Sequence, residues 1–74
     1  GLGNSIQISN NTARKLFLNG NAVCYMADGY NPGLFELAGS QEKCLYKGNV
    51  ELFSPTKEGI VYQVKGDNGI YLYK

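Results

Sequence analysis

The stretch GIVYQVKGDNGIYLYK, from Gly59 to Lys74, decides the fold class of this chain. Residues 60–65 are mostly β-branched or aromatic, which is the composition that strands favour. Residues 66–69 (GDNG) indicate a turn, because glycine, aspartate and asparagine tolerate the backbone angles of tight turns. Residues 70–74 then return to strand-type side chains. The stretch therefore predicts a β-hairpin.

The second strand of this hairpin has two chemically different faces. Alternate residues of a strand point to the same face, so Tyr71 and Tyr73 share one face and Ile70 and Leu72 share the other. Aliphatic side chains are the simpler choice for a core. We therefore expect Ile70 and Leu72 to be buried, with both tyrosines partly exposed or covered by residues 1–20.

The rest of the chain repeats this pattern of short strands and turns. No window sustains the 3.6-residue period of a helix. Turn residues recur about every 8–12 residues, which is the spacing of a small β-sandwich or barrel. We therefore predict a single domain over residues 1–74. It is all-β, a six-stranded antiparallel sandwich, in which residues 1–12 are either a strand or a flexible N-terminal segment. The earlier strand-type runs are 14–18, 22–26, 34–37, 44–47 and 50–53.

The chain has two cysteines, Cys24 and Cys44, and no histidine. Two cysteines cannot supply the four ligands of a structural zinc site, and no imidazole exists to complete one or to act in a catalytic triad. An even pair of cysteines in a short chain indicates a disulfide. It would close a loop of about 20 residues and stabilise the fold by roughly 3 kcal/mol. A disulfide implies a secreted protein. The alternative is a pair of reduced, buried thiols.

The net charge of +1 predicts no strongly charged partner. Nucleic-acid-binding proteins carry a clustered basic face, whereas only Arg14 and Lys15 are adjacent here. No apolar run approaches the roughly 20 residues of a membrane-spanning helix. The carboxylates are scattered, and so small a domain can hardly enclose the carboxylate pair of a glycosidase. We therefore expect no catalytic residue, no metal or other cofactor, and neither nucleic acid nor a membrane as partner.

Two blocks of the sequence carry a resemblance to a known family. They are VCYMADGYNPG, from Val23 to Gly33, and GIVYQVKGDNGIYLY, from Gly59 to Tyr73. Together they resemble the MAX effectors, the avirulence and ToxB-like proteins of plant-pathogenic fungi, over about residues 22–74. The second cysteine of that family usually follows the Asp/Asn turn, where this chain has Gly69. Cys44 would therefore have to pair with Cys24.

The resemblance implies a function as well as a fold. Members are small secreted six-stranded β-sandwiches that act as virulence proteins. It implies a non-enzymatic effector that binds host proteins, such as a small heavy-metal-associated domain or a plant immune receptor, and that is translocated into host cells. We expect the free protein to be monomeric.

Strand addition at an exposed sheet edge is the physical route we expect for such binding. The candidate edge strand is Leu34-Phe35-Glu36-Leu37. The alternative is an ordinary core strand in which Leu34 or Phe35 is simply buried.

Two other functions fit the composition. A secreted protease inhibitor could insert the proline-braced loop from Ser54 to Lys57 into a protease cleft. A carbohydrate- or nucleic-acid-binding β-barrel could stack its ligand on exposed tyrosines. The six tyrosines are Tyr25, Tyr30, Tyr46, Tyr62, Tyr71 and Tyr73.

Overall fold

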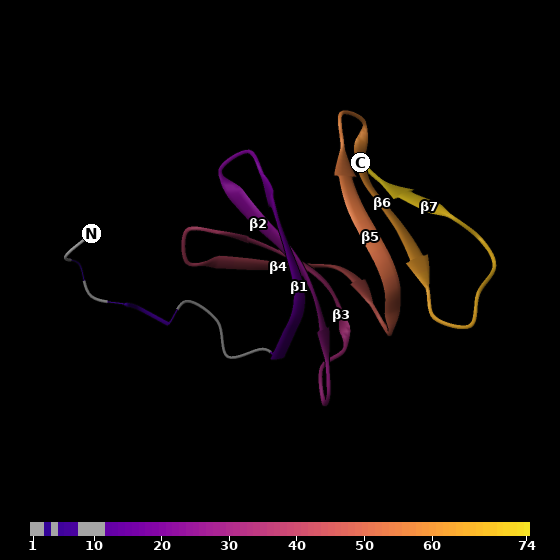
Figure 1. Cartoon of the computed structure of the whole chain (residues 1–74), viewed down its shortest axis with the longest axis horizontal. Helices are drawn as coiled ribbons and strands as arrows, with labels where there is room; N and C mark the ends of the chain where they lie inside the picture. The colour runs from indigo at the N-terminus through magenta and orange to yellow at the C-terminus, as the bar shows by residue number, and fades with distance from the viewer. Residues whose placement is uncertain (1–2, 4, 8–11) are drawn as a thin grey trace.

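The computed structural model describes residue 3, residues 5–7 and residues 12–74, and shows two antiparallel sheets (Figure 1). Sheet A has the strand order β1-β2-β3-β4 and sheet B the order β5-β6-β7. The all-β prediction is confirmed, but the described residues form seven strands instead of six. Most of the expected N-terminal segment lies outside the described residues. The strands are β1 (Thr12–Asn19), β2 (Ala22–Asp28), β3 (Gly33–Ala38), β4 (Gln41–Lys47), β5 (Val50–Thr56), β6 (Gly59–Val64) and β7 (Tyr71–Tyr73).

Sheet A is a meander of hairpins whose turns follow the sequence signals. Asn19 pairs with Ala22 across the first turn, where Gly20 has a positive φ of 66°. Gly39, at φ 63°, closes the turn in which Ala38 pairs with Gln41. These left-handed angles favour glycine. Each strand therefore lies beside its neighbour in sequence, and β1 and β4 become the two edges of the sheet.

Sheet B contains the hairpin that the C-terminal stretch predicts. β6 pairs with β7 through Ile60 with Tyr73 and Tyr62 with Tyr71. β5 continues through Pro55 to Thr56, three residues beyond the strand-type run that the sequence predicts over residues 50–53. Proline is tolerated there because β5 is an edge strand, on which a missing N–H need not interrupt the ladder.

The two sheets pack in a sandwich-like arrangement through one interior cluster. Tyr73 packs against this cluster, whereas Ile70 and Leu72 are 75% and 44% exposed. The prediction that the aliphatic face is buried is therefore wrong. The hairpin register decides this, because Tyr73 lies opposite the buried Ile60 and opposed residues share a face. The interior cluster comprises Cys24, Met26, Leu34, Val50, Phe53 and Ile60.

A second apolar cluster lies on the other face of sheet A. This outer cluster consists of Tyr25, Ala27, Phe35 and Leu37, each no more than 4% exposed. The rings of Tyr25 and Phe35 stack with centroids 5.4 Å apart. β2 and β3 are thus buried on both faces, which is why their sequences read as continuous apolar runs.

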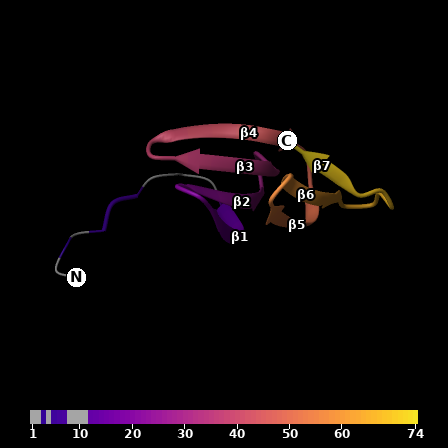
Figure 2. The same cartoon turned by 90° about the horizontal axis from the view of Figure 1, so that it is seen from above.

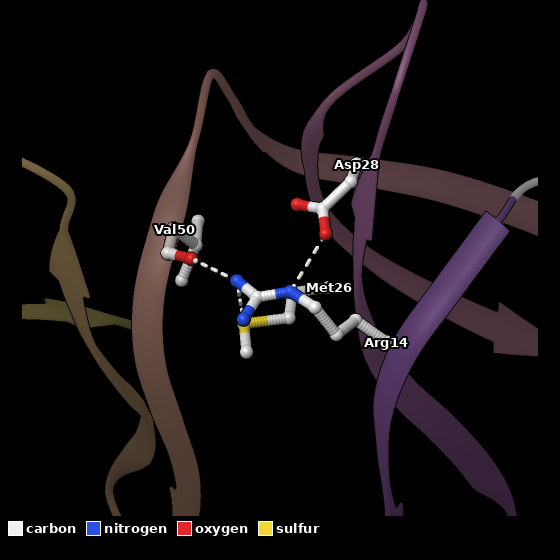
Figure 3. A network of polar contacts seen from close by, with 4 residues as sticks. All are labelled: Arg14, Met26, Asp28 and Val50. Atoms are coloured by element: carbon white, nitrogen blue, oxygen red, sulfur yellow. Dashed lines mark hydrogen bonds and ion pairs between the residues drawn. The ribbon is translucent and has the colours of Figure 1, made fainter.

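Arg14 ties the two sheets together (Figure 3). Its Nε forms an ion pair with Asp28 Oδ2 of β2 at 2.7 Å. Its Nη2 donates to the Val50 carbonyl of β5 at 3.1 Å and approaches Met26 Sδ at 3.8 Å. Arg14 is the extra residue of a bulge in β1, since Ala13 and Lys15 pair with the consecutive residues Ala27 and Met26. The bulge turns the guanidinium toward β5.

Candidate functional site

The structure separates the two cysteines, so the predicted disulfide is wrong: both thiols are free. Cys24 lies on β2 and Cys44 on β4, with β3 between them. Two strand spacings place their Cα atoms about 9–10 Å apart, beyond the roughly 7 Å that a disulfide spans. They also face opposite ways. Cys24 belongs to the interior cluster, whereas Cys44 is exposed and lies opposite Phe35 of the outer cluster.

The environment of Cys24 favours a role as a packed core side chain over a role as a nucleophile. Burial raises the pKa of the Cys24 thiol, and the nearby Glu36 carboxylate raises it further, while a hydrogen bond with the Asn19 side chain opposes the shift. A thiol with a raised pKa holds little of the thiolate that acts as a nucleophile. Cys24 is therefore a small apolar core residue. This agrees, for Cys24, with the alternative of reduced, buried thiols.

The predicted edge strand is an interior strand. Leu34 to Leu37 lie in β3, which pairs with β2 on one side and β4 on the other. Leu34 is fully buried, Phe35 and Leu37 are each 4% exposed, and only Glu36 is half-buried. The prediction that this segment is a free edge is wrong, and the alternative of a core strand is right. The sheet order decides this, since pairing on both sides leaves no backbone groups for a partner.

The free edges of the described sheets are β1, β4, β5 and β7. Exposed edges invite unwanted pairing, and proteins blunt them with charges, prolines, bulges or short strands. β4 carries Glu42, Lys43 and Lys47 and has a bulge at Leu45. β5 has a bulge after Val50 and contains Pro55, and β7 has three residues. Three of the four edges are therefore protected.

The second half of β1 lacks such protection. The bulge at Arg14 and the positive charge of Lys15 lie in its first half. From Leu16 to Asn19 the strand carries no charge or proline and keeps a regular register with β2. Figure 2 shows β1 at one side of sheet A, followed by β2, β3 and β4, and none of the seven described strands lies beyond it. We call residues 16–19 the open edge.

Leucine side chains extend the open edge onto the outer face of sheet A. Leu16 and Leu18 are 61% and 80% exposed. They lie opposite Tyr25 and Val23 of β2, and therefore continue the outer cluster toward solvent. Exposed apolar surface next to a free edge is a marker of an interaction site. The sequence contains a signal for it, because RKLFL places three apolar residues in succession, and such a run exposes apolar side chains on any edge strand.

An apolar groove of about 420 Å³ lies on the other side of β1. Phe17 of β1 lines it and meets Phe53 of β5 edge to face, with ring centroids 5.3 Å apart. Lys15 Nζ lies 5.6 Å from the Phe17 ring centroid. The volume and lining are typical of a binding groove. The full lining is Lys15, Phe17, Leu52, Phe53, Ser54, Val61, Tyr62, Gln63 and Ile70.

The tyrosines do not form one exposed face. Tyr62 contacts both Tyr46 and Tyr71, with centroids 5.4 and 5.7 Å apart, while Tyr25 is buried and Tyr30 is fully exposed. The Tyr71 hydroxyl instead donates to Asp67 Oδ2 at 2.8 Å. The backbone N–H of Gly69, and then this hydroxyl, lower the pKa of the Asp67 carboxyl. These contacts stabilise the turn between β6 and β7.

The proposed inhibitory loop is a tight hairpin. Ser54 and Pro55 belong to β5, and the chain turns at Lys57 and Glu58. The Thr56 hydroxyl donates to the Gly59 carbonyl at 2.8 Å and accepts from the Glu58 N–H at 3.2 Å. The turn is therefore held from within and projects only two residues.

A smaller, polar pocket of about 250 Å³ lies where the ends of the two sheets meet. Two residues of its lining, Lys43 and Tyr73, contact each other. Lys43 lies 5.7 Å from the ring centroid of Tyr73, and a hydrogen bond with Tyr73 raises the pKa of Lys43. Glu36 lies directly across the strand pair from Lys43. In the described part of the chain, no three His, Cys, Asp or Glu residues gather to hold a metal ion, and no helix is long and apolar enough to cross a membrane.

No family model, curated protein or solved structure matches this chain.

Proposed function

We propose that this protein acts by binding an extended segment of another protein, which adds to sheet A as a fifth strand beside the open edge. The observation that carries the proposal is the contrast between the edges. β4, β5 and β7 are blunted by charge, proline, bulges or short length, whereas residues 16–19 of β1 are regular, uncharged and flanked by apolar surface. Selection against unwanted pairing explains the three protected edges, and a binding role explains the exception.

The open edge offers both components of strand recognition. Backbone N–H and C=O groups along an edge supply affinity, and pockets for alternate side chains supply specificity. Side chains on one face of an added strand would lie beside Leu16 and Leu18. Those on the other face would lie beside Phe17 and over the rim of the apolar groove. The favoured partner segment is therefore apolar on both faces.

Charge adds one further preference. Arg14 is occupied by Asp28 and the Val50 carbonyl. Lys15 is exposed and contacts the Phe17 ring, and within the described residues it forms no ion pair. An acidic side chain on the partner, opposite Lys15, would form an ion pair with it at the rim of the interface. Such rim charges improve specificity and association rate more than affinity.

The resemblance to the MAX effectors supports the same mode of action. In that setting the partner is a host protein, and the chain is a secreted effector without enzymatic activity. The resemblance is the remaining support for secretion. Because both thiols are free, no disulfide indicates an oxidising compartment.

A phage-displayed library of random linear peptides tests the proposal, because such a library covers partner segments of any sequence. We expect selection on the immobilised protein to enrich segments of consecutive apolar residues with an acidic residue. A synthetic peptide of the enriched sequence should shift the backbone amide signals of residues 16–19. Leu18→Lys should weaken its binding at least tenfold. Leu72→Lys, the same change at an exposed leucine of β7 outside the groove lining, is the control.

Two results would refute this function. One is a selected peptide that binds wild type and Leu18→Lys equally. The other is amide shifts confined to β4 or β7, since strand addition at the open edge must perturb β1 first.

A further inference from the structure

We infer that the open edge also takes a second copy of this chain, so that two β1 strands pair antiparallel about a two-fold axis and cover the binding site. The inference rests on the availability of the open edge that the proposed function uses. It also replaces the expectation of a monomer.

Symmetry restricts the register of such a pair. With the two-fold axis perpendicular to the sheet, the outer faces of both copies lie on the same side. Opposed residues share a face, so one residue of β1, the centre of the pairing, must lie opposite its own copy across the axis. Only a few residues of β1 can be this centre. They differ in which side chains of the two copies they place opposite each other.

A centre at Phe17 places apolar side chains opposite apolar side chains. Leu16 then lies opposite Leu18 of the second copy, Leu18 lies opposite Leu16, and the two Phe17 residues face each other. Lys15 lies opposite Asn19, so that no two charges oppose. Arg14 lies opposite Gly20, where even an added Cβ would have no neighbouring atom within 4 Å. The turn at Gly20 therefore leaves room for the bulged end of the other β1.

The neighbouring centres are worse. A centre at Lys15 would oppose two like charges, which is destabilising. A centre at Leu16 would place Arg14, already engaged by Asp28, opposite Leu18. A centre at Leu18 would place Leu16 opposite Gly20 and Phe17 opposite Asn19. The two pairs between Leu16 of one copy and Leu18 of the other would then be lost. The pattern of charged and apolar residues in β1 thus favours the centre at Phe17.

The pairing should be weak. A stable interface buries about 1,600 Å² in total, and interfaces below about 1,200 Å² belong to transient complexes. One edge strand of eight residues lies in the second class. A weak dimer is also what a binding site needs, because a partner segment can then displace the second copy.

Analytical ultracentrifugation of the full chain over a range of concentrations tests the association. We expect the average mass to rise reversibly from 8.1 kDa toward twice that value. Leu18→Lys should remain at 8.1 kDa, because it places a charge opposite Leu16 of the second copy. Leu72→Lys, the same change at an exposed leucine of β7 outside the groove lining, should dimerise as wild type does. A wild type that stays monomeric throughout, or a Leu18→Lys variant that dimerises normally, would overturn the inference.

Cysteine cross-linking tests the register. In a Cys44→Ser background, chains with Leu16→Cys and chains with Leu18→Cys should form a disulfide with each other when mixed and oxidised. Each should cross-link poorly alone. Efficient cross-linking of Leu16→Cys with itself would contradict the centre at Phe17.

The two proposals fail separately. A selected peptide that binds the open edge of a strictly monomeric protein would refute the dimer and leave the proposed function standing. A dimer that is sensitive to Leu18→Lys, with no peptide that binds the edge, would support the inference and count against the proposed function.

Discussion

The cysteines give the sharpest test of this structure. In the folded protein Cys44 is exposed and unbonded, so Cys44→Ser should change the free energy of unfolding by less than about 0.5 kcal/mol, as surface substitutions do. If Cys44 were instead bonded to Cys24, the loop of about 20 residues would contribute roughly 3 kcal/mol. The two arrangements therefore differ by about 2.5 kcal/mol, far more than the error of a denaturation curve.

Urea unfolding under oxidising and reducing conditions is the assay. We expect the midpoints of wild type and Cys44→Ser to coincide, and a reductant to leave both unchanged. Thiol titration of the folded wild type should label Cys44 quickly, whereas Cys24 should react only on unfolding because it is fully buried. Cys24→Ser is the matched variant and should cost more, since it places a hydroxyl in the interior cluster. A loss of about 2 kcal/mol or more in Cys44→Ser, or in wild type on reduction, would refute the separation of the two strands.

Three further predictions concern the packing and the turn. Arg14→Ala should lower the free energy of unfolding by about 1–2 kcal/mol, since it removes a charged donor from the Val50 carbonyl and a half-exposed ion pair; urea curves that match wild type would contradict this. Leu34→Ala should cost about 2.7–5 kcal/mol in the same assay, because it opens a cavity in the interior cluster; a cost below about 1 kcal/mol would argue against that burial. Asp67 has a pKa lowered from its ordinary 3.8, so its stabilisation is present above that pH and is lost as the pH falls through the folded pKa. Asp67→Asn should therefore flatten the acid side of the stability profile, and an unchanged profile would show that the contacts with Gly69 and Tyr71 do not form.

Local patterns were sufficient for the class and for most strands. The hairpin of β6 and β7 follows from strand-type residues on both sides of a GDNG turn, and its pairing is observed. Gly20 and Gly29, which follow Asn19 and Asp28 in the first two connections of sheet A, have the positive φ that Asn-Gly and Asp-Gly turn sequences accommodate. Turn chemistry acts over a few residues, which is why a single sequence reveals it.

The candidate site could not be predicted in the same way. Residues 34–37 and residues 16–19 both read as apolar strands, yet the first segment lies inside sheet A and the second at its edge. Nothing local distinguishes them, because an edge is defined by the absence of a neighbouring strand. The groove depends on the same placement, since it forms where Phe17 of β1 meets β5 and β6.

The sequence by itself determined that this chain is all-β, where its turns fall and which segments become strands, because backbone propensity and turn geometry are local. Only the tertiary structure decided the order of the strands and the face that each side chain occupies. Sheet order set Cys24 two strands from Cys44 and buried β3. Register turned Leu72 outward and Tyr73 toward the interior cluster, because a shift of one residue exchanges the two faces of a strand.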